Sequence, residues 1–167
     1  MIRLFLFVAA VILCASYTLR VGSQPERAAI LAQAVALTLT LFDAFFLGSA
    51  SSAFRKWVSF DFPLWSWLIT DLLLLIALVT LALRANRHWT LVLAGMHLAS
   101  IFAHLVKILF PLQFPSIAYA ILLQIWAWPM IGVTALGVWQ HQRRRLRGED
   151  QPDWKPTIHG WTEPSSS

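Results

Sequence analysis

Polar side chains inside otherwise apolar stretches are the residues of this chain whose chemistry is most informative. They include carboxylates, imidazoles, a hydroxyl, an amine and an amide: Asp43, Asp71, His97, Ser100, His104, Lys107 and Gln124. An ionisable group at membrane depth costs at least ~2.5–3.5 kcal/mol, so it should face the interior of a helix bundle. Carboxylates and imidazoles can exchange protons with each other or bind a cation. We therefore treat this set as a candidate intramembrane polar site.

The clearest spacing lies between residues 97 and 107. Steps of three, four and three residues place the four polar side chains of this segment on one face of a helix: His97, Ser100, His104 and Lys107. The other faces carry Leu, Val, Ile and Phe, so the polar stripe should turn inward. Lys107 lies near the outer boundary, where its long stem would let the amine reach the headgroups.

Depth along each helix, taken at about 1.5 Å per residue, places four polar groups in one layer in the outer half of the membrane. These are Asp43, Asp71, His104 and Gln124. The similar depth predicts that Asp71 and His104 lie within direct or water-bridged hydrogen-bond reach, with Asp43 nearby. Such a layer is either a hydrogen-bonded clasp between helices or a proton path, ion site or headgroup site.

A metal ion would need a special arrangement of these groups. His97 and His104 are about 10.5 Å apart along a helix axis, which is too far for one ion. A three-ligand site from Asp43, Asp71 and His104 is the remaining metal alternative, and our main expectation is that the protein holds no metal.

The elements that must position these groups are five long apolar stretches. Of 167 residues, 58% are hydrophobic and 13% are charged, against about 25% charged in a soluble domain. Each stretch is near the ~20 residues that a helix needs to cross a bilayer. The sequence therefore predicts an all-α bundle of five transmembrane helices, within residues 1–142, at 2–19, 28–50, 62–83, 89–110 and 117–139.

Charge distribution predicts the orientation of the bundle. Nine basic residues fall on one side: Arg20, Arg27, Arg84, Arg87, Arg143, Arg144, Arg145, Arg147 and Lys155. Four fall on the other: Arg3, Arg55, Lys56 and Lys107. The positive-inside rule then places the N-terminus outside and the C-terminus in the cytoplasm. Basic residues in short loops and one tail do not indicate nucleic acid binding.

The C-terminal residues 143–167 are rich in Arg, Pro, Asp and Ser, which predicts a mostly disordered cytoplasmic tail. The basic run at its start is expected to contact anionic lipid: Arg143, Arg144, Arg145 and Arg147. Trp154 and Trp161 either touch the interface loosely or form a docking motif for a partner. At the other end, the first apolar stretch is a retained helix or a cleaved signal peptide, and Arg20 and Arg27 directly after it favour the helix.

Small residues recur every fourth position in the second apolar stretch. The row comprises Ala28, Ala32, Ala36, Thr40, Ala44, Gly48 and Ser52. Small side chains at this spacing let helix backbones approach closely, either within one chain or in a homodimer. In the last stretch, Pro129 should kink the helix. Trp126 and Trp128 beside it either fill space or line an apolar pocket for a lipid tail, quinone or pigment. We expect no other cofactor.

The segment Arg84-Ala85-Asn86-Arg87-His88-Trp89, the helix that follows it and the basic run after Trp139 resemble small multi-pass bacterial inner-membrane proteins that are uncharacterised. The resemblance implies a bacterial inner membrane and no particular activity.

The sequence contains no phosphate loop, HExxH, CxxC or Gly-x-Ser-x-Gly motif, and Cys14 is its single cysteine. We therefore expect a non-catalytic accessory or assembly subunit, or a lipid-binding protein, whose partners are lipids, other membrane subunits or a second copy. The alternative is a small transporter or proton-conducting protein that uses the Asp/His layer. A membrane enzyme, a redox protein and a holin-like pore are further alternatives.

Overall fold

The computed structural model describes residues 2–43, 65–148 and 152–155. Within these ranges the chain is helical and contains no strand, so the predicted all-α class is confirmed for them. The helices are α1 (Ile2–Val21), α2 (Gln24–Phe42), α4 (Trp65–Arg84), α5 (His88–Leu109), α6 (Ser116–Ile125) and α7 (Ala127–Leu146).

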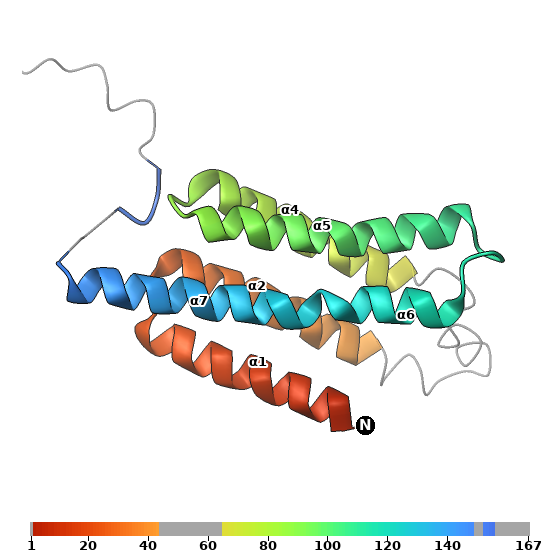
Figure 1. The fold of residues 1–167 in the computed structure, drawn as a ribbon, viewed down its shortest axis with the longest axis horizontal. Coiled ribbons are helices and arrows are strands. Elements are labelled where there is room, and N and C mark those ends of the chain that lie inside the picture. Colours follow the sequence, from red (N-terminus) through yellow and green to blue (C-terminus); the bar gives the residue numbers. More distant parts are fainter. Residues whose placement is uncertain (1, 44–64, 149–151, 156–167) are drawn as a thin grey trace, which may run out of the picture.

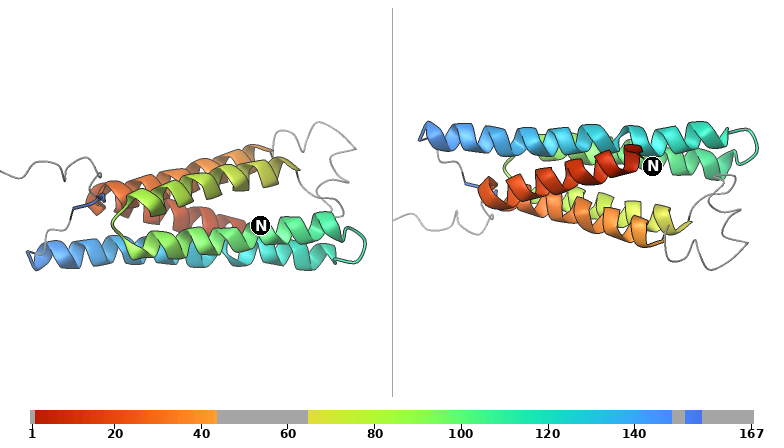
Figure 2. Two further views of the ribbon diagram at one scale, coloured as in Figure 1. Left: turned by 90° about the horizontal axis from the view of Figure 1, so that it is seen from above. Right: turned by 90° about the horizontal axis from the view of Figure 1, so that it is seen from below.

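The helices run along one common direction and form a bundle (Figure 1). α1 packs on α2 and α7, α2 on α4, α4 on α5, and α5 on α6 and α7. Seen from above and below, α2 and α4 lie in one layer and α5, α6 and α7 in another (Figure 2). The α1–α2 turn, the α4–α5 turn and the C-terminal end of α7 lie at one end of the bundle (Figure 1).

Apolar residues occupy both the core and the outer surface. Ala29, Leu78 and Leu93 are buried where α2, α4 and α5 meet. Large apolar side chains such as Phe5 and Ile76 point outward and are mostly exposed. A water-soluble monomer rarely exposes so much contiguous apolar surface, whereas lipid solvates it well.

Three segments are long and apolar enough to cross a membrane. They are Trp65–Arg84, His88–Leu109 and the combined α6–α7 segment Ile117–Leu146. The apolar part of α1, Phe5–Val21, is shorter than these three segments. The first turn of α2 contains Glu26 and Arg27, and the predicted continuation of this helix, residues 44–50, lies outside the described residues.

The predicted kink in the last apolar stretch is an interruption between α6 and α7 at Trp126. Pro129 has no backbone N–H, so the carbonyl of Ile125, four residues earlier, has no helical donor. Helical bonding resumes where Met130 N donates to Trp126 O, at 3.2 Å. The sequence identified Pro129 as the cause of the kink, and the structure shows that the helix is interrupted three residues earlier, at Trp126.

Two helices extend beyond the predicted apolar boundaries. α2 begins at Gln24, four residues before the predicted start, because Pro25 and Glu26 are well suited to a first helical turn. α7 continues to Leu146, beyond the predicted end at residue 139. Its last turn is basic, which suits the negative end of a helix. These two helices therefore extend beyond their apolar stretches into polar residues.

Residues 152–155 also differ from the prediction of a disordered tail. Asn86 N donates to Asp153 O at 3.1 Å, and Lys155 N donates to Arg84 O at 2.9 Å. Ala85 and Trp154 thereby form an isolated antiparallel bridge. This part of the tail is therefore attached to the α4–α5 turn, and the prediction of disorder was wrong for it.

Candidate intramembrane polar site

Asp71 on α4 lies at the centre of a polar cluster between helices. Its carboxylate oxygen Oδ2 accepts a hydrogen bond from Ser100 Oγ at 3.1 Å and lies 3.1 Å from His104 Nε2. Its backbone oxygen lies 2.9 Å from His97 Nε2, and its Oδ1 lies 3.9 Å from the same nitrogen. The predicted hydrogen-bond reach between Asp71 and His104 is therefore observed.

The spacing along α5 explains why these three partners meet one carboxylate. His97, Ser100 and His104 follow one another at three and four residues, so they share the face of α5 that packs on α4. All three side chains are buried. Asp71 bridges two histidines that are too far apart along the helix to share a single ion.

Tyr119 on α6 completes the cluster, and sequence reasoning missed it. Its hydroxyl lies 2.7 Å from His104 Nδ1, and the two rings meet edge to face with centroids 5.5 Å apart. Tyr119 is 0% exposed and His104 is 1% exposed. A polar atom on an aromatic ring near the start of the last apolar stretch was the available signal. Tyr119, His104 and Asp71 thus link α6, α5 and α4.

The two nitrogens of His104 define what the cluster can do chemically. When neutral, His104 donates from Nε2 to the carboxylate and accepts at Nδ1 from the Tyr119 hydroxyl. When protonated, it donates from both nitrogens, and the hydroxyl rotates to accept. Ionised Asp71 with neutral histidines carries one net negative charge, and one added proton removes that charge. The geometry therefore accommodates both protonation states without breaking a contact.

Exposure distinguishes Asp71 from His104. The Asp71 side chain is 22% exposed, whereas that of His104 is 1% exposed. Asp71 is therefore the member of this pair that is reachable from outside the bundle, and His104 is enclosed within it.

Asp43 and Gln124 are not part of this cluster. Asp43 Oδ2 accepts a hydrogen bond from Ser66 Oγ at 2.6 Å, near the start of α4. Gln124 is exposed on the surface of α6, so the expectation that it faces the interior was wrong. In the part of the chain that the structure describes, no group of three His, Cys, Asp or Glu side chains could hold a metal ion. The three-ligand alternative with Asp43 has no support there.

Lys107 shares the stripe on α5 but has a different role. It is almost fully buried, and its Nζ donates to the carbonyls of Pro111 at 3.1 Å and Phe114 at 3.0 Å. The expectation that its amine reaches the headgroups was therefore wrong. Lys107 instead holds the turn between α5 and α6, where a cation suits the negative end of a helix.

Trp126 and Trp128 lie at the α6–α7 break. Trp128 meets Phe7 of α1 edge to face, with ring centroids 5.4 Å apart, and it is 47% exposed. Trp126 is half-buried at the break itself. The contact with Phe7 agrees with the space-filling alternative for Trp128, and both alternatives stay open for Trp126.

The described part of the small-residue row lies along α2. Ala36 is buried in the core shared with α4, and Ala28 and Ala32 lie beside a groove between the same two helices. Thr40 donates to Ala36 O within its own helix. The row therefore allows contact within the chain along α2, and its other members, Ala44, Gly48 and Ser52, lie outside the described residues.

The basic run occupies the end of α7. Arg143 lies over the ring of Trp139 at 4.0 Å, and Arg144 Nη2 lies 3.5 Å from Gln140 Oε1. Arg145 and Arg147 are exposed. Their predicted contact with anionic lipid stays a prediction.

Comparison of the chain with family models, with curated proteins and with solved structures finds no match.

Proposed function

We propose that this chain is a small multi-pass membrane protein whose Asp71–His104 pair binds and releases a proton, as a transporter or proton-conducting protein would require. Five spans in a bacterial inner membrane, with the N-terminus outside and the C-terminus in the cytoplasm, are part of this proposal. The five apolar stretches and the basic asymmetry support them.

The single observation that carries the proposal is the hydrogen-bonded series from Tyr119 through His104 to a partly exposed carboxylate. A purely structural contact needs no ionisable groups, because Ser, Thr and Asn join helices without the cost of a charge. A carboxylate beside two imidazoles is instead a set of three proton acceptors, and one added proton makes the set neutral. His97 extends the polar groups by about 10 Å along α5.

Proton flux into liposomes tests the proposal. The full chain is reconstituted with an internal pH dye, and a potassium gradient with valinomycin drives protons inward. We expect the wild-type protein to acidify the lumen and Asp71→Asn to show the rate of empty liposomes, because an amide cannot titrate. Asp43→Asn is the matched control, since it removes a carboxylate outside the cluster and should keep the flux.

The outcome that contradicts the proposal is equally specific. Equal flux in the wild-type protein and a folded Asp71→Asn variant would mean that the cluster is a clasp, because Asn can keep the hydrogen bonds. Flux that fails in both carboxylate variants would not single out Asp71 and would count against the assignment.

A second candidate is an accessory or assembly subunit, or a lipid-binding protein, that acts through helix contacts with lipids, other membrane subunits or a second copy. The observation that favours it is the groove between α2 and α4, beside which the C-terminal segment docks. Purification of the full chain from native membranes tests this candidate, since bound subunits or lipid would accompany it.

A further inference from the structure

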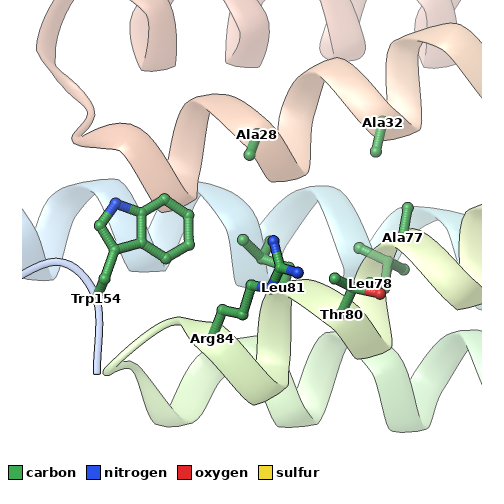
Figure 3. Close-up of a pocket in the computed structure, with 8 residues that line it drawn as sticks. All are labelled: Ala28, Ala32, Ala77, Leu78, Thr80, Leu81, Arg84 and Trp154. Carbon is green, nitrogen blue, oxygen red and sulfur yellow. The ribbon is translucent and has the colours of Figure 1, made fainter. Parts of the chain in front are cut away.

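A groove lies between α2 and α4 at the end of the bundle that holds the α4–α5 turn. Its volume is about 220 Å³, and Figure 3 shows the side chains that line it. Ala28 and Ala32 line it from α2, and Ala77 and Leu81 line it from α4. The small Ala side chains on both helices leave space between them. Because Ala and Leu form most of its walls, the groove is largely apolar.

The mouth of the groove is cationic. Arg84 ends α4 there, and its side chain extends from α4 towards the side of the groove formed by α2 (Figure 3). The Lys155 backbone is hydrogen-bonded to the Arg84 carbonyl, so a second cationic residue adjoins it. Both side chains are exposed, and within residues 2–43, 65–148 and 152–155 neither has a hydrogen bond or ion pair to another side chain.

Two acidic residues that the structure describes at this end have partners of their own. Asp153 forms an ion pair with Arg87 at 3.1 Å, and Glu26 accepts a hydrogen bond from Ser23. Neither carboxylate is in contact with Arg84 or Lys155. Within residues 2–43, 65–148 and 152–155, no ion pair neutralises the positive charge at the mouth.

Trp154 closes one side of the groove. Its Nε1 donates to Gln24 Oε1 at 2.7 Å, and its backbone is paired with Ala85. The indole is thus held at the polar end of an apolar groove, which is the environment that tryptophan favours at a membrane interface.

We propose that this groove binds one anionic phospholipid. Its phosphate contacts Arg84 and Lys155, and one acyl chain lies along Ala28, Ala32 and Ala77. A guanidinium matches the geometry of a phosphate, and a hydrocarbon chain matches the walls. A free phosphate would leave the apolar walls of the groove uncovered.

The lipid site does not rest on the proton-binding proposal, and it specifies the ligand of the second candidate function. Binding of lipid and flux of protons are separate measurements on different residues. Failure of one leaves the other intact.

Native mass spectrometry of the full chain tests the site, with phosphatidylglycerol and phosphatidylcholine added in turn to the same detergent. We expect the wild-type protein to retain a phosphatidylglycerol adduct. Arg84→Gln should bind this lipid about fivefold more weakly, since one basic residue near anionic lipid changes the affinity by about tenfold or less. Arg20→Gln removes the same charge from an exposed position at the same end but outside the groove, and it should bind as the wild type does.

The apolar half of the site needs its own variant. Ala77→Leu adds bulk to the groove at an exposed position, so it should fold and lose the adduct, whereas Ala9→Leu on the exposed face of α1 should keep it. Ala28→Leu serves the same purpose if Ala77→Leu does not fold. The proposal would be overturned by equal binding of both lipids or by equal loss in Arg84→Gln and Arg20→Gln. Retention of the adduct in the groove-filling variant, or competition by inorganic phosphate, would also overturn it.

Discussion

Removal of the hydrogen bond between Tyr119 and His104 tests how much the polar cluster contributes to the free energy of unfolding. In Tyr119→Phe the ring stays and the hydroxyl is lost, so His104 Nδ1 loses the partner that lies 2.7 Å away. Neither residue is accessible to water, so no solvent molecule replaces the hydroxyl. A buried polar atom left without a partner costs about 1–3 kcal/mol, and interhelical bonds in membranes contribute about 0.6–2 kcal/mol. We expect a loss of about 1–2 kcal/mol in the free energy of unfolding.

The assay is reversible unfolding in mixed micelles, with helix content as the signal. Tyr17→Phe is the matched control, because Tyr17 donates to Gln142 in an exposed pair and water can replace that bond. The control should lose less than about 0.5 kcal/mol. A double-mutant cycle of Tyr119→Phe with Asp71→Asn should show coupling, since both groups act on His104.

Stability of Tyr119→Phe within error of the wild type would refute the reasoning. It would mean that His104 finds another acceptor or donor at no cost, and that the cluster is not a closed hydrogen-bonded set. Strict additivity in the cycle would mean that Tyr119 and Asp71 do not act through one imidazole.

Two further predictions concern packing and orientation. Gly137→Ala should lose about 1–3 kcal/mol of stability in the same assay, because its new Cβ would lie 2.8 Å from the Trp89 ring, whereas Gly132→Ala meets nothing within 4 Å and should be neutral. A reporter active only in the cytoplasm, fused after residue 167, should be active, and a periplasmic reporter at the same site should be silent; the reverse pattern would contradict the positive-inside assignment.

Helical spacing was the most reliable guide to the site. The steps between His97, Ser100 and His104 placed all three on one face, and the structure brings that face to Asp71. Periodicity fixes which side chains share a face, and the cost of polar groups in lipid fixes which way the face turns. These two facts were enough to identify one partner, Asp71, at similar depth.

Depth alone was not enough for the other members of the predicted layer. It states a height along the helix but not the direction in which a side chain points, so Gln124 was placed inside although it faces outward. Asp43 contacts Ser66, which lies five residues, about 7.5 Å along the helix, before Asp71. Tyr119 was missed for the converse reason, because no property of one residue shows which imidazole its hydroxyl will meet.

The different roles of the stripe on α5 bear directly on function. Lys107 is a fixed cation on the same face of α5, and its amine is bound to the carbonyls of Pro111 and Phe114 rather than to Asp71. Within residues 2–43, 65–148 and 152–155, the ionisable groups in contact with Asp71 are His97 and His104. Neither is a permanent cation, so compensation of the carboxylate within these contacts requires a proton. A site whose charge balance depends on an exchangeable proton is the arrangement that proton coupling needs, and a fixed ion pair between Lys107 and Asp71 would have removed that dependence.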